Sequence, residues 1–283
     1  MQRVLSTYRY VNQPLSASLL GEISQAGIPA IEIFCSLRHF NYRAPERVRE
    51  LRDMLAEHRL ELHSLHSPTE RDSAPGRDSG VPISISDTER IRRLDAVDEV
   101  KRALEVAEQV PFKFLVQHMG HGRQSADPRN MDAAFNSLEN LAVFAKGRGV
   151  IIALENTPSE IGSPSSLQQF IVETHLNDVR LCLDTGHAHM DAGVDAAVEL
   201  MREGIATCHV HDNHGEKDEH LLPFEGGIDW EATIGALAAG PLAPAIVLEL
   251  KDQSSGKPTL EQVCAAFDKL EKIYEGKRRT VKS

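Results

Sequence analysis

The segment from residue 208 to residue 230, CHVHDNHGEKDEHLLPFEGGIDW, is rich in side chains that can do chemistry. It holds four histidines and six acidic residues, and it closes on a Gly-Gly pair and the only tryptophan of the chain. Imidazole nitrogens and carboxylate oxygens bind divalent cations, and both groups transfer protons in enzymes. This density of ligand-type residues indicates a loop that contributes to a metal or catalytic site.

Four short apolar runs are followed by a residue that can bind metal. VIIAL is followed by Glu155, RLCL by Asp184 and AIVL by Glu249, and IATC is followed by His209. Each case alone has an ordinary explanation, because acidic residues after strands often cap helices and strand histidines are often satisfied core groups. Together, three carboxylates at one place would repel one another without a cation, because burying unpaired carboxylates is costly. The joint pattern predicts a divalent metal site.

Further polar residues stand where the same site would lie, after strand-like runs or within the histidine-rich segment. His211 differs from His209 by one strand period, so both side chains could face the same side. Spacing alone therefore leaves open which of the two binds metal. The remaining candidates for substrate contacts or additional metal ligands are His66, His118, His187, Asp218 and His220.

Eight short apolar runs that are typical of β-strands alternate with longer segments of helical period. The runs are RVLST, PAIEIF, LELHSLH, FKFLVQH, VIIALE, RLCLD, IATCHVH and AIVLEL. Eight strands, each followed by a helix, predict an α/β protein with a single (β/α)8 TIM barrel across residues 1–283 and an active site at the C-terminal strand ends. A doubly wound open sheet is the alternative, but its Gly-rich phosphate turn is absent from the sequence.

The sequence predicts a helix, a long loop and a frayed chain end in three further segments. The segment 87–110 predicts the clearest helix, with an opening that can cap its first turn. The polar segment 67–87 predicts a long loop after the third strand, and such a loop in a compact barrel is usually functional. The basic segment at about 276–283 predicts a frayed, solvated chain end. The apolar face expected for the helix in the segment 87–110 consists of Ile91, Leu94, Val97 and Leu104.

Composition limits the partners and the location of the protein. The formal net charge of -11 repels phosphate-rich partners at long range, so no nucleic-acid partner is expected. The four cysteines lie far apart without a C-x-x-C pair, which favours reduced thiols. The first residues lack the apolar region of a signal peptide, and no window approaches a membrane span. We expect a soluble cytoplasmic protein without a membrane partner, and the sequence gives no signature of an oligomeric state.

Several motifs together resemble those of the xylose isomerase-like TIM barrels. They are ALENT, CLDTGHAH, CHVHDN, the D-x-H-x-x-P-x-x-G pattern in DEHLLPFEGG, the GIDW that follows it and the terminal IVLEL. That superfamily includes divalent-metal isomerases and epimerases of sugars and sugar phosphates, and also abasic-site endonucleases. The resemblance covers about residues 3–270, and its motifs are specific to the superfamily and not to one reaction.

The resemblance implies roles for the candidate residues. His209 is favoured over His211 because it takes the ligand position in the H-x-x-D of HVHD, and His187 resembles the substrate-contacting histidine of the ketose epimerases. Two positions depart from the pattern: Gly215 stands where those epimerases usually carry a sugar-gripping arginine, and Phe224 where glycine is common. By similarity, the shared metal set is Glu155, Asp184, His209 and Glu249. The additional residues resemble ligands with which the endonucleases hold three zinc ions: His66, His118, His187, Asp218 and His220.

An isomerase or epimerase of hydroxy-carbonyl compounds must remove a proton next to a carbonyl and stabilise the resulting enediolate. A divalent cation supplies that stabilisation, and two carboxylates on opposite sides act as base and acid, roles that we assign to Glu155 and Glu249. The carboxylates favour Mn²⁺ or Mg²⁺, and the additional imidazoles favour Zn²⁺. The predicted function is therefore a metal-dependent isomerase or epimerase of a small sugar, sugar phosphate or related compound.

Two other functions compete with this hypothesis. A metal-dependent phosphodiesterase or abasic-site endonuclease would use two or three metals, up to three Zn²⁺, to activate water and neutralise the leaving oxygen. Such an enzyme needs basic loops that grip DNA, and the segment 67–87 has only Arg71 and Arg77 among four acidic residues. The third hypothesis is a barrel that binds metal and a small ligand without catalysis.

Overall fold

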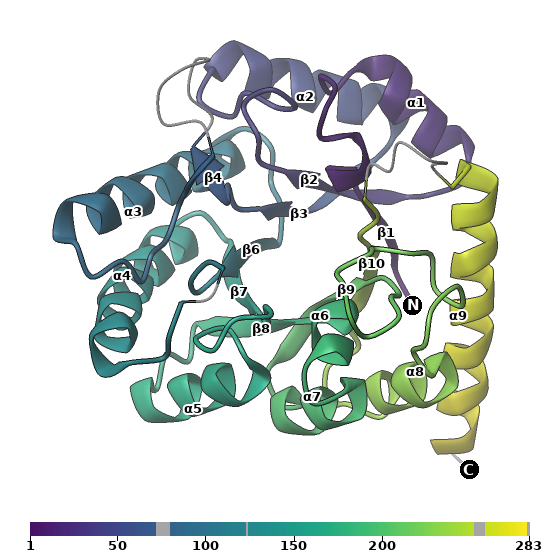
Figure 1. The fold of residues 1–283 in the computed structure, drawn as a ribbon. Helices are drawn as coiled ribbons and strands as arrows, with labels where there is room; N and C mark the ends of the chain where they lie inside the picture. The colour runs from purple at the N-terminus through teal and green to yellow at the C-terminus, as the bar shows by residue number, and fades with distance from the viewer. Residues whose placement is uncertain (72–79, 123, 252–257, 282–283) are drawn as a thin grey trace.

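Eight parallel strands form a closed barrel (Figure 1), in the computed structural model that describes residues 1–71, 80–122, 124–251 and 258–281. Around the barrel the strands follow the order β1, β10, β9, β8, β7, β6, β3 and β2, and β2 pairs with β1. They coincide with the eight predicted runs, so the (β/α)8 prediction is confirmed. The barrel strands are β1 (Arg3–Ser6), β2 (Ala30–Phe34), β3 (Glu61–His66), β6 (Phe114–His118), β7 (Ile151–Glu155), β8 (Val179–Asp184), β9 (Ile205–Val210) and β10 (Ala245–Leu248).

Helices surround the strands as an outer ring (Figure 1). A parallel sheet needs this cover because it has no face that can be left to water. Local sequence sets where several helices begin: Ser16, Asp127 and Ser163 each accept a backbone N–H of the first turn. The helices are α1 (Ala17–Gln25), α2 (Pro45–His58), α3 (Arg90–Leu104), α4 (Pro128–Lys146), α5 (Pro164–Thr174), α6 (Thr185–Met190), α7 (Val194–Met201), α8 (Trp230–Ala238) and α9 (Leu260–Val281), with 3₁₀ helices η1 (Thr7–Tyr10) and η2 (Glu105–Glu108).

The main apolar core lies between the strands and the helices, and the inside of the barrel changes from apolar to polar along the strands. One small apolar group inside contains Ala30 of β2, and the next residue on that face, Glu32, is charged and fully buried. In β9, Thr207 and His209 follow the same alternation. Side chains two apart along a strand share a face, so these strand sequences place polar groups toward the C-terminal mouth.

The helix expected in the segment 87–110 is present as α3, but its buried face differs from the predicted one. Ile91 and Leu94 are 69% and 48% exposed, whereas Val97 and Leu104 are buried as expected. The buried positions begin at Ala96, about two turns into the helix. Asp87 accepts the backbone N–H of Glu89, so it orders the turn before the helix and not the helix itself.

Residues 276–281 of the basic segment are helical and form the last part of α9. Lysine and arginine are good helix formers, and positive charge at a helix C-terminus is favourable to the helix dipole. Arg278 also donates to the hydroxyl of Tyr274 at 3.4 Å, one turn earlier.

The long loop after β3 contains a short antiparallel hairpin of β4 (Glu70–Arg71) and β5 (Val81–Pro82). Residues 72–79, which include Arg77, lie outside the described residues. Among the described helices, none is both long and apolar enough to cross a membrane. All four cysteines are free thiols, in agreement with the predicted reduced state.

Candidate metal centre

The C-terminal ends of four adjacent strands bring the four predicted metal ligands together. Glu155 and Asp184 are the last residues of β7 and β8, His209 lies in β9, and Glu249 follows β10 directly. Strand pairing aligns Asp184 with His209, and the backbone N–H of Glu249 donates to the carbonyl of Val210 at 3.2 Å. All four side chains are buried, and one ligand atom from each lies within 4.8 Å of the others. This cluster could hold one divalent cation.

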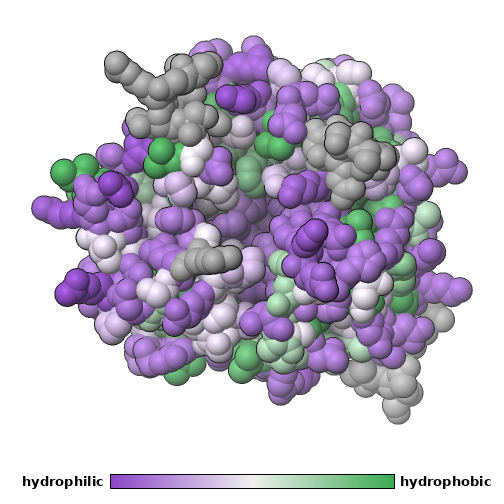
Figure 2. Space-filling view, in the orientation of Figure 1, coloured by the Kyte–Doolittle hydropathy of each residue, from purple (hydrophilic) through white to green (hydrophobic). Residues whose placement is uncertain are grey.

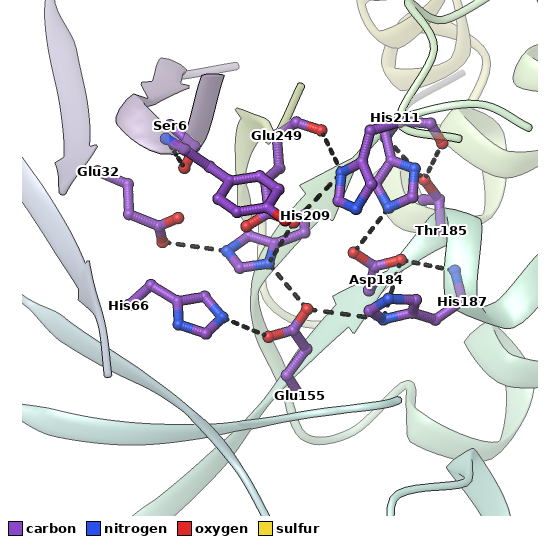
Figure 3. Close-up of polar contacts among 12 residues, drawn as sticks. Ser6, Glu32, His66, Glu155, Asp184, Thr185, His187, His209, His211 and Glu249 are labelled. Carbon is purple, nitrogen blue, oxygen red and sulfur yellow. Dashed lines mark hydrogen bonds and ion pairs between the residues drawn. The ribbon is translucent and has the colours of Figure 1, made fainter. Parts of the chain in front are cut away.

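Glu155 is the residue on which most contacts converge (Figure 3). Its Oε2 lies 3.2 Å from His66 Nε2 and 3.0 Å from His118 Nε2. Its Oε1 lies 3.0 Å from His209 Nδ1 and 3.8 Å from His187 Nδ1. The ligand atoms of His66, Glu155 and His209 also lie within 4.8 Å of one another, so they form a second candidate set that shares two residues with the first.

The buried imidazoles and carboxylates of the cluster shift one another's pKa. Burial opposes a charge on His209, but acidic neighbours that include Glu32, Glu249 and Glu155 raise its pKa well above the usual value. Burial likewise opposes ionisation of Glu155, but His209 and His118 hold its pKa well below the usual value. A divalent cation would supply positive charge at the same place. Both the donor set and the charge of this cluster therefore fit a metal ion.

A second group of ligand-type side chains lies beside the first, with ligand atoms within 4.8 Å of one another: His187, His211, Asp218 and His220. Asp218 is its centre, because its Oδ2 lies 2.9 Å from His220 Nε2 and 3.7 Å from His187 Nε2. Asp184 connects the two groups, since its Oδ2 lies 3.1 Å from His211 Nε2. Burial opposes a charge on His187, but Asp184 and Asp218 raise its pKa to about 10.

Asp184 combines a structural role with a ligand position. Its Oδ1 accepts the backbone N–H of His187 at 2.7 Å and so caps α6, while Oδ2 faces the second group. The side chain of Asn156 holds the Asp184 backbone, accepting its N–H at 2.7 Å and donating to its carbonyl at 2.9 Å. The ordinary explanation of an acidic residue after a strand thus applies to Oδ1, while Oδ2 contacts His211 Nε2 at 3.1 Å.

The structure places His209 and His211 in different groups. His209 points into the cluster of Glu155 and Glu249, whereas His211 Nε2 points to Asp184 and Asp218. The strand β9 ends at Val210, so the two-residue alternation does not extend to His211. Each of the nine residues expected at the site contacts at least one other of the nine at the barrel mouth. His63, in contrast, contacts Thr207 Oγ1 at 3.3 Å inside the barrel.

Three histidines at the site have their orientation fixed by backbone carbonyls. His66, His187 and His220 donate Nδ1–H at 2.8, 2.9 and 2.9 Å, respectively, which leaves Nε2 of each facing a carboxylate. Nε2 is therefore the nitrogen available to a cation. The acceptors are the carbonyl oxygens of Ser67, Asn156 and Glu249.

Two residues at the site, Glu32 and His211, are not among the nine that the sequence motifs predict. Glu32 is buried in β2, and its Oε2 lies 3.1 Å from His209 Nε2. The signal was a single glutamate inside the apolar run PAIEIF, where a charge is costly unless it has a partner. His211 was recorded only as an alternative to His209, and it instead belongs to the group centred on Asp218.

The carboxylate of Asp212 holds the histidine-rich loop within residues 208–230 in place through hydrogen bonds. This carboxylate is fully buried and accepts four N–H groups at 2.8–3.2 Å, three from the backbone and one from the indole of Trp230. A Cβ at Gly226 would lie only 2.4 Å from Asp212 Oδ1, so glycine is required for this close approach. The Gly-Gly pair and the tryptophan of the loop are therefore parts of one anchor that positions Asp218 and His220.

Replacing Asp212 with alanine should lower the free energy of unfolding by about 3–5 kcal/mol, because several buried donors lose a charged acceptor. Asp229→Ala is the matched control in the same loop: Asp229 only caps α8, and its loss should cost about 1 kcal/mol. Urea denaturation of both variants measures the difference. Equal losses would contradict the anchoring role.

The two departures from the motif pattern have local explanations. Phe224 has a φ of 77°, in the region that favours glycine, and its N–H donates to Asp212 Oδ2 at 3.0 Å. Its ring packs 6.0 Å from the ring of Trp230, and Lys269 lies over it. Gly215 has a φ of 84°, so the position usually held by arginine is here part of a left-handed turn.

A comparison with protein-family models matches residues 20–273 to the xylose isomerase-like TIM barrel. The chain belongs to this family. Among curated relatives, an uncharacterized protein of Methanocaldococcus jannaschii is 27% identical over 236 residues, which are 80% of this chain and 75% of that protein. A second uncharacterized protein, from Sinorhizobium fredii, is 25% identical over 213 residues, 69% of this chain and 68% of that protein.

Solved structures of the same fold include proteins named as epimerases. A D-tagatose 3-epimerase-like protein has a TM-score of 0.79 and 23% identity, covering 99% of this chain and 100% of that one. An L-ribulose 3-epimerase has a TM-score of 0.78 and 18% identity, covering 99% and 96%. The IolI protein, solved with a bound zinc atom, has a TM-score of 0.77 and 17% identity, covering 98% and 99%.

Proposed function

We propose that this protein is a divalent-metal-dependent isomerase or epimerase of a sugar, a sugar phosphate or a related hydroxy-carbonyl compound. The observation that carries the proposal is the buried cluster of Glu155, Asp184, His209 and Glu249, whose ligand atoms lie within 4.8 Å of one another. It stands at the C-terminal mouth of the barrel, where enzymes of this fold have their active sites. The IolI protein, a structural neighbour solved with a bound zinc atom, supports a metal ion in a barrel of this fold.

The four residues would hold one Mn²⁺, Mg²⁺ or Zn²⁺ ion, which, when bound, stabilises negative charge on the oxygens of an enediolate. The chain itself supplies the proton transfers. Glu155 and Glu249 come from β7 and from the end of β10, with β8 and β9 between them, so their carboxylates approach the site from different directions. One removes the proton next to the substrate carbonyl, and the other returns a proton.

Glu249 is the better placed of the two to act as the base. Its Oε2 lies 3.7 Å from both His209 Nδ1 and His220 Nδ1, whereas both oxygens of Glu155 are within 3.2 Å of imidazole nitrogens. A carboxylate that is tightly held by positive groups is a weak base. The longer contacts of Glu249 leave an oxygen more available to a substrate carbon.

A cavity of about 210 Å³ lies at the ends of β1, β2 and β3. Two aromatic rings of its wall reach the site: Tyr8 lies 5.3 Å from the ring of His220, and Phe34 lies 4.6 Å from the ring of His66. Glu70 also lines it. Aromatic faces beside polar groups suit a small polyhydroxy compound. The surrounding face of the molecule is mostly hydrophilic and hollowed near its middle (Figure 2).

The names of the structural neighbours support the same substrate class, since they include a D-tagatose 3-epimerase-like protein, a 3-keto-D-glucoside 4-epimerase and an L-ribulose 3-epimerase. The test is metal analysis of the purified protein together with turnover of a panel of ketoses and ketose phosphates. We expect one bound divalent ion per chain and, for the true substrate, incorporation of solvent deuterium next to the carbonyl. Absence of both metal and turnover across the panel would reject the proposal.

The second group of ligands favours one alternative, a phosphodiesterase with several metals. His187, His211, Asp218 and His220 could hold a further ion beside the first cluster, and two or three ions can activate water and neutralise a leaving oxygen. The net charge of -11 weighs against binding to DNA. Three zinc ions per chain, with cleavage of abasic-site DNA at physiological salt that Glu155→Gln abolishes, would establish this function instead.

A further inference from the structure

Glu32 is a buried carboxylate that reaches the candidate metal centre from inside the barrel (Figure 3). Its Oε2 lies 3.1 Å from His209 Nε2, and the hydroxyl of Ser64 on the neighbouring strand donates to the same oxygen at 2.8 Å. The other oxygen, Oε1, is buried and has no hydrogen-bond partner among the described residues. His209 and Ser64 are therefore the two hydrogen-bond partners of this carboxylate among the described residues.

His209 lies between Glu32 and the ligand cluster. Its Nε2 faces Glu32, while its Nδ1 faces Glu155 Oε1 at 3.0 Å and Glu249 Oε2 at 3.7 Å. A hydrogen bond from one ring nitrogen to a carboxylate fixes the proton on that nitrogen and the orientation of the ring. With the proton on Nε2, the lone pair of Nδ1 points at the place where the other ligands converge.

This arrangement distinguishes His209 from other histidines of the site. His66, His187 and His220 each donate to a backbone carbonyl, a neutral acceptor. His209 instead has a carboxylate behind it, and a charged acceptor makes a stronger hydrogen bond and a more basic ligand nitrogen. His209 therefore differs from the other three histidines in that its hydrogen-bond acceptor is a side chain, which can be changed by mutation.

A purely structural ion pair explains the arrangement less well. Two buried charged groups cost more to desolvate than well-packed apolar side chains of the same volume, so a barrel that only needed filling would gain little from them. Apolar residues do fill the inside of the barrel at Ala30, two positions before Glu32. The buried charge of Glu32 is instead explained by its contact with His209, because the other ring nitrogen of His209, Nδ1, faces the ligand cluster.

We propose that Glu32 is a positioning residue of the metal centre, which accepts the Nε2–H of His209 and directs Nδ1 of that ring at the bound cation. This inference rests on the metal site of the proposed function. Loss of such a partner lowers metal affinity by about 10–100-fold in other proteins. We expect a Zn²⁺ dissociation constant about 10-fold or more higher in Glu32→Leu, which cannot accept the hydrogen bond. Glu32→Gln, whose amide oxygen still accepts it, should fall in between.

The experiment measures Zn²⁺ affinity of the full chain by competition with a chromophoric chelator, beside the melting temperature of each metal-free variant. Glu99→Gln is the matched control, because Glu99 is also a buried carboxylate, which pairs with Arg43 and Arg102 away from the site. It should lose stability and keep its affinity for Zn²⁺. Ser64→Ala, which removes only the hydroxyl that holds Glu32, should weaken Zn²⁺ binding to a smaller extent.

The outcomes distinguish a failure of the positioning role of Glu32 from a failure of the proposed metal site. Weaker Zn²⁺ binding in Glu32→Leu, with normal binding in Glu99→Gln, supports the positioning role. Unchanged Zn²⁺ binding in Glu32→Leu overturns the positioning role and leaves the proposed function intact. Equal losses of Zn²⁺ affinity in Glu32→Leu and Glu99→Gln have the same meaning. A wild-type protein that does not bind Zn²⁺ overturns both. If Glu32→Leu does not fold, the order of wild type, Glu32→Gln and Ser64→Ala decides: equal affinities in all three overturn the inference.

Discussion

Glu249→Gln is expected to lower the rate of proton exchange at the carbon next to the substrate carbonyl by about 100-fold or more, the size typical of a lost general base. Glutamine keeps the shape of the side chain and an oxygen that can bind metal, but it cannot accept the proton. The variant should therefore retain most of its bound metal. The measurements are metal content and solvent-deuterium incorporation, by mass spectrometry and NMR, with the substrate found in the panel.

The matched control is Glu219→Gln, a carboxylate of the same length in the adjacent loop that pairs with the exposed His214. It should exchange deuterium at the wild-type rate. Wild-type turnover without any deuterium incorporation, combined with an equally fast Glu249→Gln variant, would show that the two-glutamate mechanism is wrong. Loss of both metal and activity in Glu249→Gln would instead make Glu249 a ligand alone.

Asp184→Asn is expected to abolish the thermal stabilisation that a divalent ion gives to the wild-type protein. An ion at 100 times its dissociation constant stabilises the folded state by about 2.7 kcal/mol, which for a chain of this size corresponds to roughly 5–10 °C in melting temperature. Asn keeps an oxygen that can cap α6, as Asp184 Oδ1 does now. The metal-free variant should therefore fold, while the missing charge weakens ion binding.

The melting temperature is measured after removal of metal with a chelator and again after addition of Zn²⁺ or Mn²⁺. His214→Ala, which changes an exposed histidine outside both ligand groups, serves as the control and should show the full increase. A wild-type protein whose melting temperature is unaffected by the chelator and by the added ions would count strongly against a metal site. An unchanged increase in Asp184→Asn would remove Asp184 from the ligand set.

The sequence by itself determined the fold and most of the ligand-type residues of the site. Alternating strand and helix periods are local properties, so eight strand-like runs and their order could be read along the chain. A polar residue at the end of an apolar strand is equally local, which is why Glu155, Asp184 and Glu249 could be selected. In a parallel barrel all strands end at one face, and this rule alone predicted that these carboxylates would meet.

Features that depend on where an element stops were not determined by the sequence. Strand alternation predicted that His209 and His211 could face the same side, and both reach the barrel mouth, but they belong to different groups of ligand-type side chains because β9 ends at Val210. Likewise, the helical period predicted a buried Ile91, but this residue of the first turn of α3 is 69% exposed. Periodicity describes a regular element and carries no information beyond its end.

Contacts across the closed barrel were the second feature that only the tertiary structure decided. Glu32 and His209 are 177 residues apart in the sequence and lie on strands that are not neighbours in the sheet. Their contact arises because closing eight strands into a barrel turns the inward side chains of non-adjacent strands toward one another. A glutamate within an apolar run signals a buried charge that needs a partner, but the partner is fixed only when the barrel closes.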